Sequence, residues 1–182
     1  MPAIQQIRWS GFGGQGVVLA GVLLGQAGVI DGKNVSTSNS YGVAARGAAC
    51  KSEIIFSDGP IDFPHLITAD IFVAMSQGAY KTYGQDVRSE SGIIIYDQGL
   101  VTPREDSKIK QVGIPATEIA VQKLKEKQAA NVVLLGAMSE ITGLASRPAL
   151  RKAILIHVGK QFQALNLKAL SLGQKLGRHA HG

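Results

Sequence analysis

The sequence predicts an α/β protein: a three-layer sandwich with a mostly parallel, Rossmann-like sheet and a helical C-terminal third. Strand-like segments alternate with helix-like segments through the first two-thirds of the 182 residues, and only helical patterns follow. Segments 69–75 and 92–97 are almost wholly apolar, which is typical of strands buried on both faces of a parallel sheet. No repeat or linker interrupts the chain, so we expect one domain over residues 1–174 and a disordered tail over 175–182.

The first predicted strand covers Ile4–Ser10 and leads into a glycine-rich loop and an apolar helix, Val17–Ile30. Gly21, Gly25 and Gly28 share one side of that helix, where a strand or a second helix can approach closely. Further strands are expected at 34–38, 51–57, 69–75, 92–97 and 108–114, the last being more polar and nearer an edge. Further helices are expected at 76–83, from 115, at 131–143, from 146 and at 161–174, with Ser76 and Ser146 as N-caps.

The positive charge does not indicate a nucleic-acid site. The formal net charge is +6, but Lys and Arg gather in the stretches 108–127 and 147–175 and in the tail, with no basic block interleaved with aromatics. Solvated helix faces explain this distribution. The apolar segment Val17–Ile30 is shorter than the ~20 residues that span a bilayer, so we expect no membrane partner.

The reactive side chains exclude several kinds of chemistry. Cys50 is the single cysteine, so neither an internal disulfide nor an iron–sulfur cluster, which needs about four thiolates, can form. This thiol content fits a cytoplasmic location. The four histidines show no metal-ligand spacing, and no catalytic triad or carboxylate pair stands out. We therefore expect no metal site and no catalytic residue, and we interpret Asp70 and Asp97 as turn or capping residues.

The loop that follows the first strand is the strongest candidate site, with Gly11, Gly13, Gly14, Gln15 and Gly16 as its residues. The spacing satisfies the dinucleotide fingerprint, and a helix N-terminus there suits a phosphate. The second predicted strand, however, ends in 36–39 without the acid that would hold a ribose, which argues against NAD. Two interpretations stay open: the glycines serve only a tight turn and close packing, or they admit a phosphate-bearing ligand or a partner.

A second candidate loop spans 40–47 and contains Tyr41, Gly42, Arg46 and Gly47. An arginine among small residues can clamp a phosphate or carboxylate with two hydrogen bonds. The alternative is a salt bridge that only orders the loop. We favour a binding role, because so many small residues surround a single charge.

Several motifs together resemble the gamma subunit, or gamma domain, of 2-oxoacid:ferredoxin oxidoreductases. They are Gly11-Phe12-Gly13-Gly14-Gln15-Gly16-Val17, Ser40-Tyr41-Gly42, Arg46-Gly47, Ala69-Asp70, Tyr96-Asp97, Pro115-Ala116-Thr117, the segment 131–137, and Asn166, Ala169 and Gly173 in the last helix. The similarity covers about Ile4 to Gly173. Ala48 stands where the family usually has a second glycine after Arg-Gly.

The resemblance implies a non-redox subunit of a complex that oxidatively decarboxylates a 2-oxoacid, with 2-oxoglutarate as the expected substrate, and forms an acyl-CoA. Ferredoxin or flavodoxin accepts the electrons. It also implies alpha and beta partner subunits, with a delta subunit in some complexes. Thiamine diphosphate and iron–sulfur clusters belong to those partners, and this chain alone binds no cofactor. The residues of the two candidate loops would contact CoA or a neighbouring subunit.

Other functions remain open at the level of sequence. The beta subunit of an indolepyruvate oxidoreductase shares this domain. A stand-alone nucleotide-binding protein or NAD(P)-dependent enzyme would also carry a glycine-rich loop. A purely structural assembly module is the third alternative.

Overall fold

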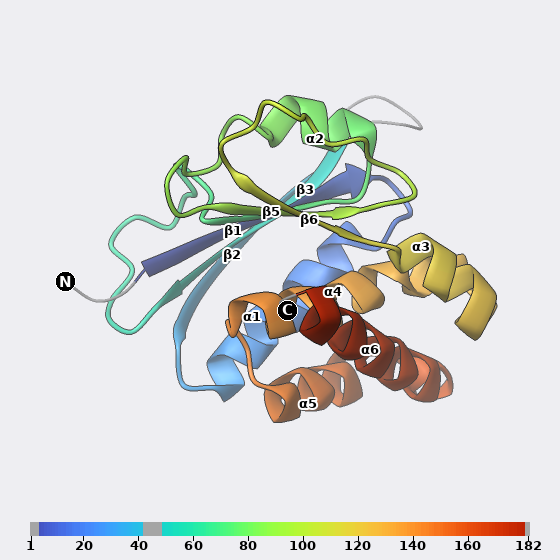
Figure 1. The fold of residues 1–182 in the computed structure, drawn as a ribbon. Helices are drawn as coiled ribbons and strands as arrows, with labels where there is room; N and C mark the ends of the chain where they lie inside the picture. The colour runs from blue at the N-terminus through green and yellow to red at the C-terminus, as the bar shows by residue number, and fades with distance from the viewer. Residues whose placement is uncertain (1–3, 42–48, 181–182) are drawn as a thin grey trace.

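The computed structural model of the chain describes residues 4–41 and 49–180 (Figure 1). Its strands are β1 (Ile4–Phe12), β2 (Asn34–Tyr41), β3 (Ala49–Ser57), β4 (Ile71–Ala74), β5 (Ile93–Asp97) and β6 (Lys110–Ile114). Its α-helices are α1 (Val17–Ile30), α2 (Gln77–Tyr83), α3 (Ala116–Ile119), α4 (Ala130–Thr142), α5 (Arg147–His157) and α6 (Lys160–Ala180). A π-helical turn (Ala120–Leu124) and a 3₁₀ turn (Lys127–Ala129) join α3 to α4.

The six strands form one sheet in the order β2-β3-β1-β4-β5-β6. Strand β3 is antiparallel to both of its neighbours, β2 and β1, whereas β1, β4, β5 and β6 pair in parallel. Five strands therefore run in one direction and β3 in the other, which confirms a mostly parallel sheet. β3 is the one departure from a Rossmann arrangement, because it separates β2 from β1.

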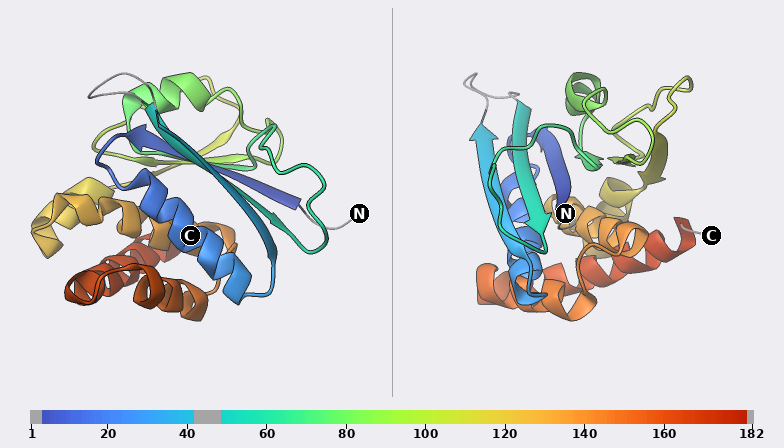
Figure 2. Two further views of the ribbon diagram at one scale, coloured as in Figure 1. Left: turned by 180° about the vertical axis from the view of Figure 1, so that it is seen from behind. Right: turned by 90° about the vertical axis from the view of Figure 1, so that its left-hand side faces the viewer.

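The helices cover the two faces of the sheet unequally (Figures 1 and 2). Helix α2 lies over one face, and α1, α4, α5 and α6 lie on the other. The larger core fills the space between the sheet and these four helices, and its fully buried side chains include Trp9, Leu24 and Leu135. A smaller core under α2 contains Phe72, Tyr80 and Ile94. This arrangement confirms the layered α/β class and the helical C-terminal third.

Helix α1 packs unusually close to the antiparallel strands through its glycines. A Cβ atom at Gly21 would lie 1.9 Å from Ser52 Oγ, one at Gly25 2.9 Å from Thr37 Cγ2, and one at Gly28 2.5 Å from the Phe56 ring. The predicted close approach of a strand is therefore confirmed, and β2 and β3 supply it. This packing fixes the direction of α1 and hence the position of its N-terminus.

The predicted capping residues and edge strand are also confirmed. Ser76 accepts a hydrogen bond from Ala79 N, and Ser146 accepts one from Ala149 N, each at 3.2 Å. Strand β6 is an edge strand. Strands β1 and β2 are longer than predicted, ending at Phe12 and Tyr41, because each pairs with β3 over its whole length.

The prediction that residues 175 onward are disordered is wrong for the part that the structure describes. Helix α6 continues to Ala180. A Cβ at Gly177 would lie 2.5 Å from Ala137 O, and Arg178 Nη1 lies 3.8 Å from Glu140 Oε2. The last turns of α6 thus pack against α4, and this contact, which the polar sequence of the tail hides, keeps the segment helical.

Within residues 4–41 and 49–180, no helix has both the length and the apolar character needed to cross a membrane.

Candidate functional site

The glycine-rich loop lies at the carboxyl ends of the parallel strands, where α/β proteins commonly bind ligands. Strand β1 ends at Phe12, and α1 begins at Val17. A cavity of about 400 Å³ opens beside the loop. We call it the loop groove; it is lined by Gly13, Gly14, Gln15, Met75, Thr117, Glu126, Lys127, Gln128 and Ala130. The groove thus gathers the end of β1, the residue after β4, the start of α3 and the turn before α4.

Gln15 holds the loop in shape with both ends of its amide. Its Oε1 accepts a hydrogen bond from Phe12 N at 2.6 Å, and its Nε2 donates one to Met75 O at 2.8 Å. A Cβ at Gly11 would lie 2.5 Å from that Oε1 and 2.9 Å from Met75 Cβ. Gly11 is therefore required by packing, and Gln15 ties the loop to the end of β4.

Gly16 also has an internal structural role. It adopts a left-handed backbone conformation (φ 73°), and its carbonyl accepts a hydrogen bond from Asn131 Nδ2 at 3.0 Å. A Cβ there would lie 2.2 Å from that nitrogen. Asn131 is buried at the start of α4, so it fastens the N-terminus of α1 to the central helix.

Gly13 and Gly14 differ from the other two glycines. A Cβ at either would meet no atom of the described chain within 4 Å. Gly14 needs glycine for its backbone, at φ 89°, but Gly13 has no left-handed backbone. The described chain therefore gives no reason for a glycine at Gly13, and the space beside it opens into the loop groove. A group outside the chain that approaches the backbone would supply that reason.

A second cavity, of about 300 Å³, adjoins the other side of Gly14. Its lining includes Gly16 and the apolar side chains of Leu19, Val158, Phe162 and Leu165. Gly14, Glu126 and Gln128 line both cavities. The two cavities thus meet at Gly14, with Thr117 and Lys127 in the lining of the loop groove and Phe162 in that of the second cavity.

Asp97 positions the wall of the loop groove from inside the protein. It is fully buried at the end of β5, and its Oδ2 accepts hydrogen bonds from Thr117 N at 3.0 Å and Thr117 Oγ1 at 2.5 Å. The interpretation of Asp97 as a capping residue is confirmed, since these bonds satisfy the first turn of α3. Asp70 accepts from Gln6 N at 2.8 Å and pairs with Arg88 at 2.7 Å.

The second candidate loop falls mostly outside the described residues, which include neither Gly42, Arg46 nor Gly47. Tyr41 ends β2, and its backbone pairs with Cys50; Ala49 pairs with Phe12. The segments that flank residues 42–48 therefore lie at the same end of the strands as the glycine-rich loop.

Sequence reasoning missed several residues of this site: Met75, Thr117, Asn131 and the turn Glu126–Gln128. Asn131 could have been found, because it is polar in a helix that is otherwise apolar nearly all round. The turn could not, because its position depends on the π-helical turn before it and on Lys125, whose φ is 57°. Nothing in the local sequence pattern predicts that geometry.

Among the described residues, no group of three or more His, Cys, Asp and Glu side chains could hold a metal. Cys50 is buried, and burial raises the pKa of its thiol above the ordinary value. A neutral, buried thiol is a poor ligand and a poor nucleophile. The residues present do not fit an iron–sulfur cluster.

Solved structures similar to this chain include parts of oxoacid oxidoreductases. The gamma subunit of a keto/oxoacid ferredoxin oxidoreductase from Geobacter sulfurreducens is 37% identical, with a TM-score of 0.87 over 98% of both chains. A 2-oxoglutarate:ferredoxin oxidoreductase from Magnetococcus marinus, solved with 2-oxoglutarate, coenzyme A and succinyl-CoA, matches with a TM-score of 0.85 at 23% identity. This chain covers 31% of that longer chain, and the likeness concerns the fold alone. The fold and loop thus define an oxidoreductase-complex subunit of the gamma type.

Sequence relatives lead to the same class. The 2-oxoglutarate synthase subunit KorC of Methanocaldococcus jannaschii is 43% identical over 96% of this chain and 94% of its own length. The ketoisovalerate oxidoreductase subunit VorA of Methanothermobacter marburgensis is 33% identical over 95% of this chain but only 36% of its own length. The chain belongs to the pyruvate ferredoxin/flavodoxin oxidoreductase family, which matches residues 6–176. The resemblance stated from the sequence is confirmed.

Proposed function

We propose that the chain is the gamma subunit of a multi-subunit 2-oxoglutarate:ferredoxin oxidoreductase. The observation that carries this proposal is the 43% identity to a 2-oxoglutarate synthase subunit over nearly the full length of both chains. In the proposed reaction 2-oxoglutarate and CoA give succinyl-CoA and carbon dioxide, and two electrons pass to ferredoxin or flavodoxin. The proposal places the complex in the cytoplasm.

In this proposal the chain contributes no redox group. The single cysteine cannot hold a cluster, so the iron–sulfur clusters belong to partner subunits. Thiamine diphosphate, which supplies the decarboxylation chemistry, is assigned to the alpha and beta subunits. The role of this chain is to shape and close part of the site that those subunits form.

The loop groove is the proposed contact with CoA or with a neighbouring subunit. Three features support it: a backbone at Gly13 that is open to a close approach, the N-terminus of α1, which attracts negative charge, and Lys127 in the lining. Glu126 lines the same groove and opposes an anion there. We therefore place any phosphate on the Gly13 and Lys127 side. Tyr41, Gly42, Arg46 and Gly47 remain proposed contacts.

The decisive experiment is reconstitution with candidate alpha and beta subunits from the same organism. The complex is assayed for CoA-dependent ferredoxin reduction with 2-oxoglutarate, pyruvate, 2-oxoisovalerate and an aryl-pyruvate. We expect 2-oxoglutarate to have the highest kcat/KM. Preference for the aryl-pyruvate would instead support the indolepyruvate alternative. Unchanged CoA dependence and assembly in Arg46→Ala would remove Arg46 from the proposed contacts.

Calorimetry of the isolated chain separates the remaining alternatives. Titration with NAD, NADP, ATP and CoA tests a stand-alone nucleotide-binding protein. Tight binding of NAD or NADP by the lone chain would support that rival and contradict the proposal. If loop variants fail only in assembly and never in CoA dependence, the chain is a structural module.

A further inference from the structure

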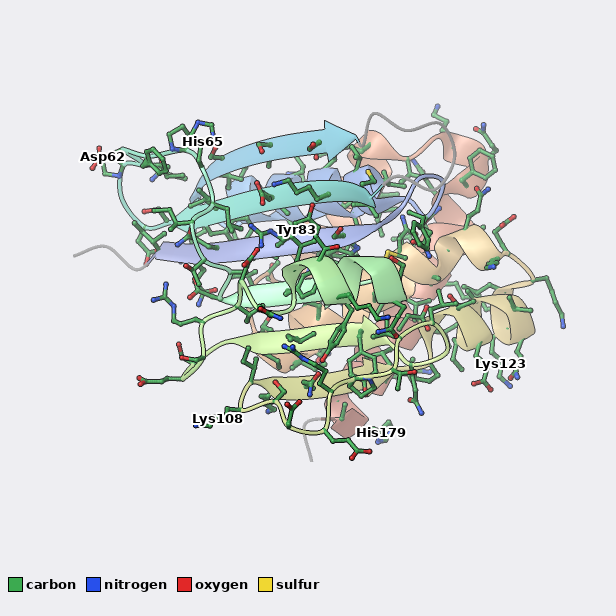
Figure 3. The ribbon with its side chains drawn as sticks, turned by 90° about the horizontal axis from the view of Figure 1, so that it is seen from above. Asp62, His65, Tyr83, Lys108, Lys123 and His179 are labelled. Carbon is green, nitrogen blue, oxygen red and sulfur yellow. The ribbon has the colours of Figure 1, made fainter. Side chains whose placement is uncertain are left out.

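Strand β2 lies at the edge of the sheet with one side unpaired. It pairs with β3 from Asn34 to Tyr41, and no other strand of the described chain pairs with it. In Figure 3 it is the outermost, light-blue arrow, with nothing of the sheet beyond it. A strand of eight residues in this position offers a row of backbone donors and acceptors to another chain.

Strand β2 also lacks the usual protection of an edge strand. Its sequence, Asn-Val-Ser-Thr-Ser-Asn-Ser-Tyr, contains no proline and no charged residue. The opposite edge is protected. Strand β6 is shorter, at five residues, and carries Lys110. Gln111 on β6 donates a hydrogen bond to Arg104 O at 2.8 Å and also bonds the Tyr80 hydroxyl, which secures a loop beside that strand.

A loop with exposed apolar residues, and with Asp62 and His65 among them, adjoins the N-terminal half of β2. Ser36 Oγ donates a hydrogen bond to Pro64 O at 3.3 Å, which brings the loop 58–69 against the strand. Figure 3 shows Asp62 and His65 at this end of the sheet. Phe63 is 58% exposed, Ile67 71% and Ile4 50%, and these residues line a groove of about 330 Å³ whose floor includes Ile55. Exposed apolar residues gathered around a groove mark interaction surfaces.

We propose that the edge of β2 and the Phe63–Ile67 loop form the docking surface for a partner subunit of the complex. An extended segment of that subunit adds a strand to β2, and an apolar side chain from another part of the same subunit fills the groove. This inference rests on the proposed function, because it needs a complex. The chemistry of the surface indicates the occupant: a row of unpaired backbone groups is matched along its length by another extended backbone, and the groove matches an apolar side chain.

Two observations favour a partner subunit over a second copy of this chain. The strand that a second copy would add, β2 itself, is polar apart from Val35 and Tyr41, so it has few apolar side chains to offer the groove. In the relative VorA, moreover, this domain is 36% of a longer chain. A domain that is covalently joined to the rest of a longer chain in that relative needs a contact surface when it is a separate chain. The absence of charge from β2, on a chain of net charge +6, fits the charge-depleted centre of an interface.

Hydrogen exchange locates the interface directly. Mass spectrometry compares the isolated chain with the purified complex containing the alpha and beta subunits. We expect the amides of Asn34–Ser40 and of the 58–69 loop to exchange about tenfold or more slowly in the complex. The amides of α5 serve as the internal comparison and should change little.

Two variants and one control test the surface by function. Asn39→Lys places a charge on the edge strand, and Ile67→Asp places one at the groove; both positions are exposed, so the fold is retained. Each should weaken binding of the alpha and beta subunits by about tenfold or more. The control, Ile156→Asp, alters an isoleucine that is 54% exposed on α5, away from this surface, and should bind as the wild type does.

The outcomes separate this inference from the proposed function. If the wild-type chain forms an active complex but Asn39→Lys and Ile67→Asp assemble normally and β2 stays unprotected, the docking surface is wrong and the function stands. A homodimer that protects β2 equally well without partners would also overturn it. If the wild-type chain binds no alpha or beta subunit, the proposed function fails first.

Discussion

The four glycines of the loop have different structural roles. The roles differ in which atoms, if any, a Cβ atom added at each glycine would contact. Gly11 and Gly16 are crowded by Gln15 and Asn131, respectively. Gly14 needs its left-handed backbone, whereas Gly13 has neither restriction. The sequence motif alone treats them as equivalent. Three glycines are therefore required by the chain itself and Gly13 is not, which makes the site testable residue by residue.

Gly13→Ala and Gly16→Ala should therefore differ in their effect on the free energy of unfolding. We expect Gly13→Ala to leave the free energy of unfolding within about 0.5 kcal/mol of the wild type, since its methyl meets open space. Gly16→Ala should cost about 1–3 kcal/mol through backbone strain and displacement of Asn131. Urea denaturation measures both. Equal stability of the two variants would contradict the assigned role of Asn131.

Assembled into the complex, Gly13→Ala should then raise the KM for CoA or weaken subunit binding while the fold stays intact. Titration of CoA with the reconstituted enzyme checks this effect. Wild-type values for both quantities would remove the external role of Gly13.

Gln15→Glu tests the hydrogen bond from Gln15 to Met75 O, because a glutamate side chain has nearly the same shape as a glutamine. The carboxylate can still accept from Phe12 N, but it cannot donate to Met75 O, so two oxygens face one another. We expect a loss of about 1–3 kcal/mol at neutral pH. Thermal unfolding followed by circular dichroism measures it. Because protonation of the carboxylate restores a donor, part of the loss should be recovered as the pH falls.

At the scale of elements, glycines let α4 and α6 touch along their length. A Cβ at Gly136 would lie 2.3 Å from Leu170 O, and one at Gly173 1.9 Å from Val133 O. The backbone of each helix thus packs directly against the other. Both sequences are helical by pattern, but no pattern shows that these two helices are partners, because that depends on which glycines face one another.

Gly173→Ala should destabilise the protein by about 1–3 kcal/mol or more, because α6 must move away from α4. Gly78→Ala is the matched control in helix α2. There the methyl would lie 3.5 Å from the Phe12 ring, and the gain in helix propensity should stabilise by about 0.5–1 kcal/mol. Paired urea titrations give both values. A neutral Gly173→Ala would mean that α6 has room to shift.

Glu140 links three helices and should make stability depend on pH. Its carboxylate in α4 binds Arg147 in α5 at 2.5 and 2.6 Å, with Arg178 of α6 nearby. The hydrogen bond from Arg147 lowers the pKa of Glu140 below its ordinary value, outweighing burial. A lowered folded-state pKa means that the contribution is present above the unfolded pKa and is lost as the pH falls through the folded one.

The corresponding measurement is the Tm of the wild type and of Glu140→Gln between pH 7 and pH 3. We expect the variant to melt at a lower temperature at pH 7 and the two curves to converge in acid. A constant difference across that range would show that the ion pair does not carry the effect.

For the whole molecule, the sequence predicts the fold class and the place of the glycine-rich loop well and the topology less well. Buried strands such as Ile93–Asp97 and the loop before Val17 follow from local patterns. The direction of β3 does not, since a hairpin and a crossover can have the same alternation in Ala49–Ser57. The helical end of α6 was missed because its order comes from α4. Long-range contacts therefore determine the direction of β3 and the length of α6, which local sequence patterns do not predict.

The isolated chain should show no turnover of 2-oxoglutarate and no calorimetric binding of thiamine diphosphate. Among the described residues, no group of three or more His, Cys, Asp and Glu side chains could hold a metal ion, and the Cys50 thiol is buried and neutral. Adding the alpha and beta subunits should restore CoA-dependent reduction of ferredoxin. Turnover by the chain alone, at a rate unaffected by partners, would require a catalytic group that we have not assigned.

The hydrogen bond from Asn131 to Gly16 O joins positions 115 residues apart in the chain. During synthesis, therefore, the N-terminal loop emerges long before the residue that fixes its geometry. The loop groove, which also needs Thr117 and the Glu126–Gln128 turn, is completed only after α4 has left the ribosome. A nascent chain thus cannot present a finished groove, and any contact made through this groove must follow translation of most of the domain.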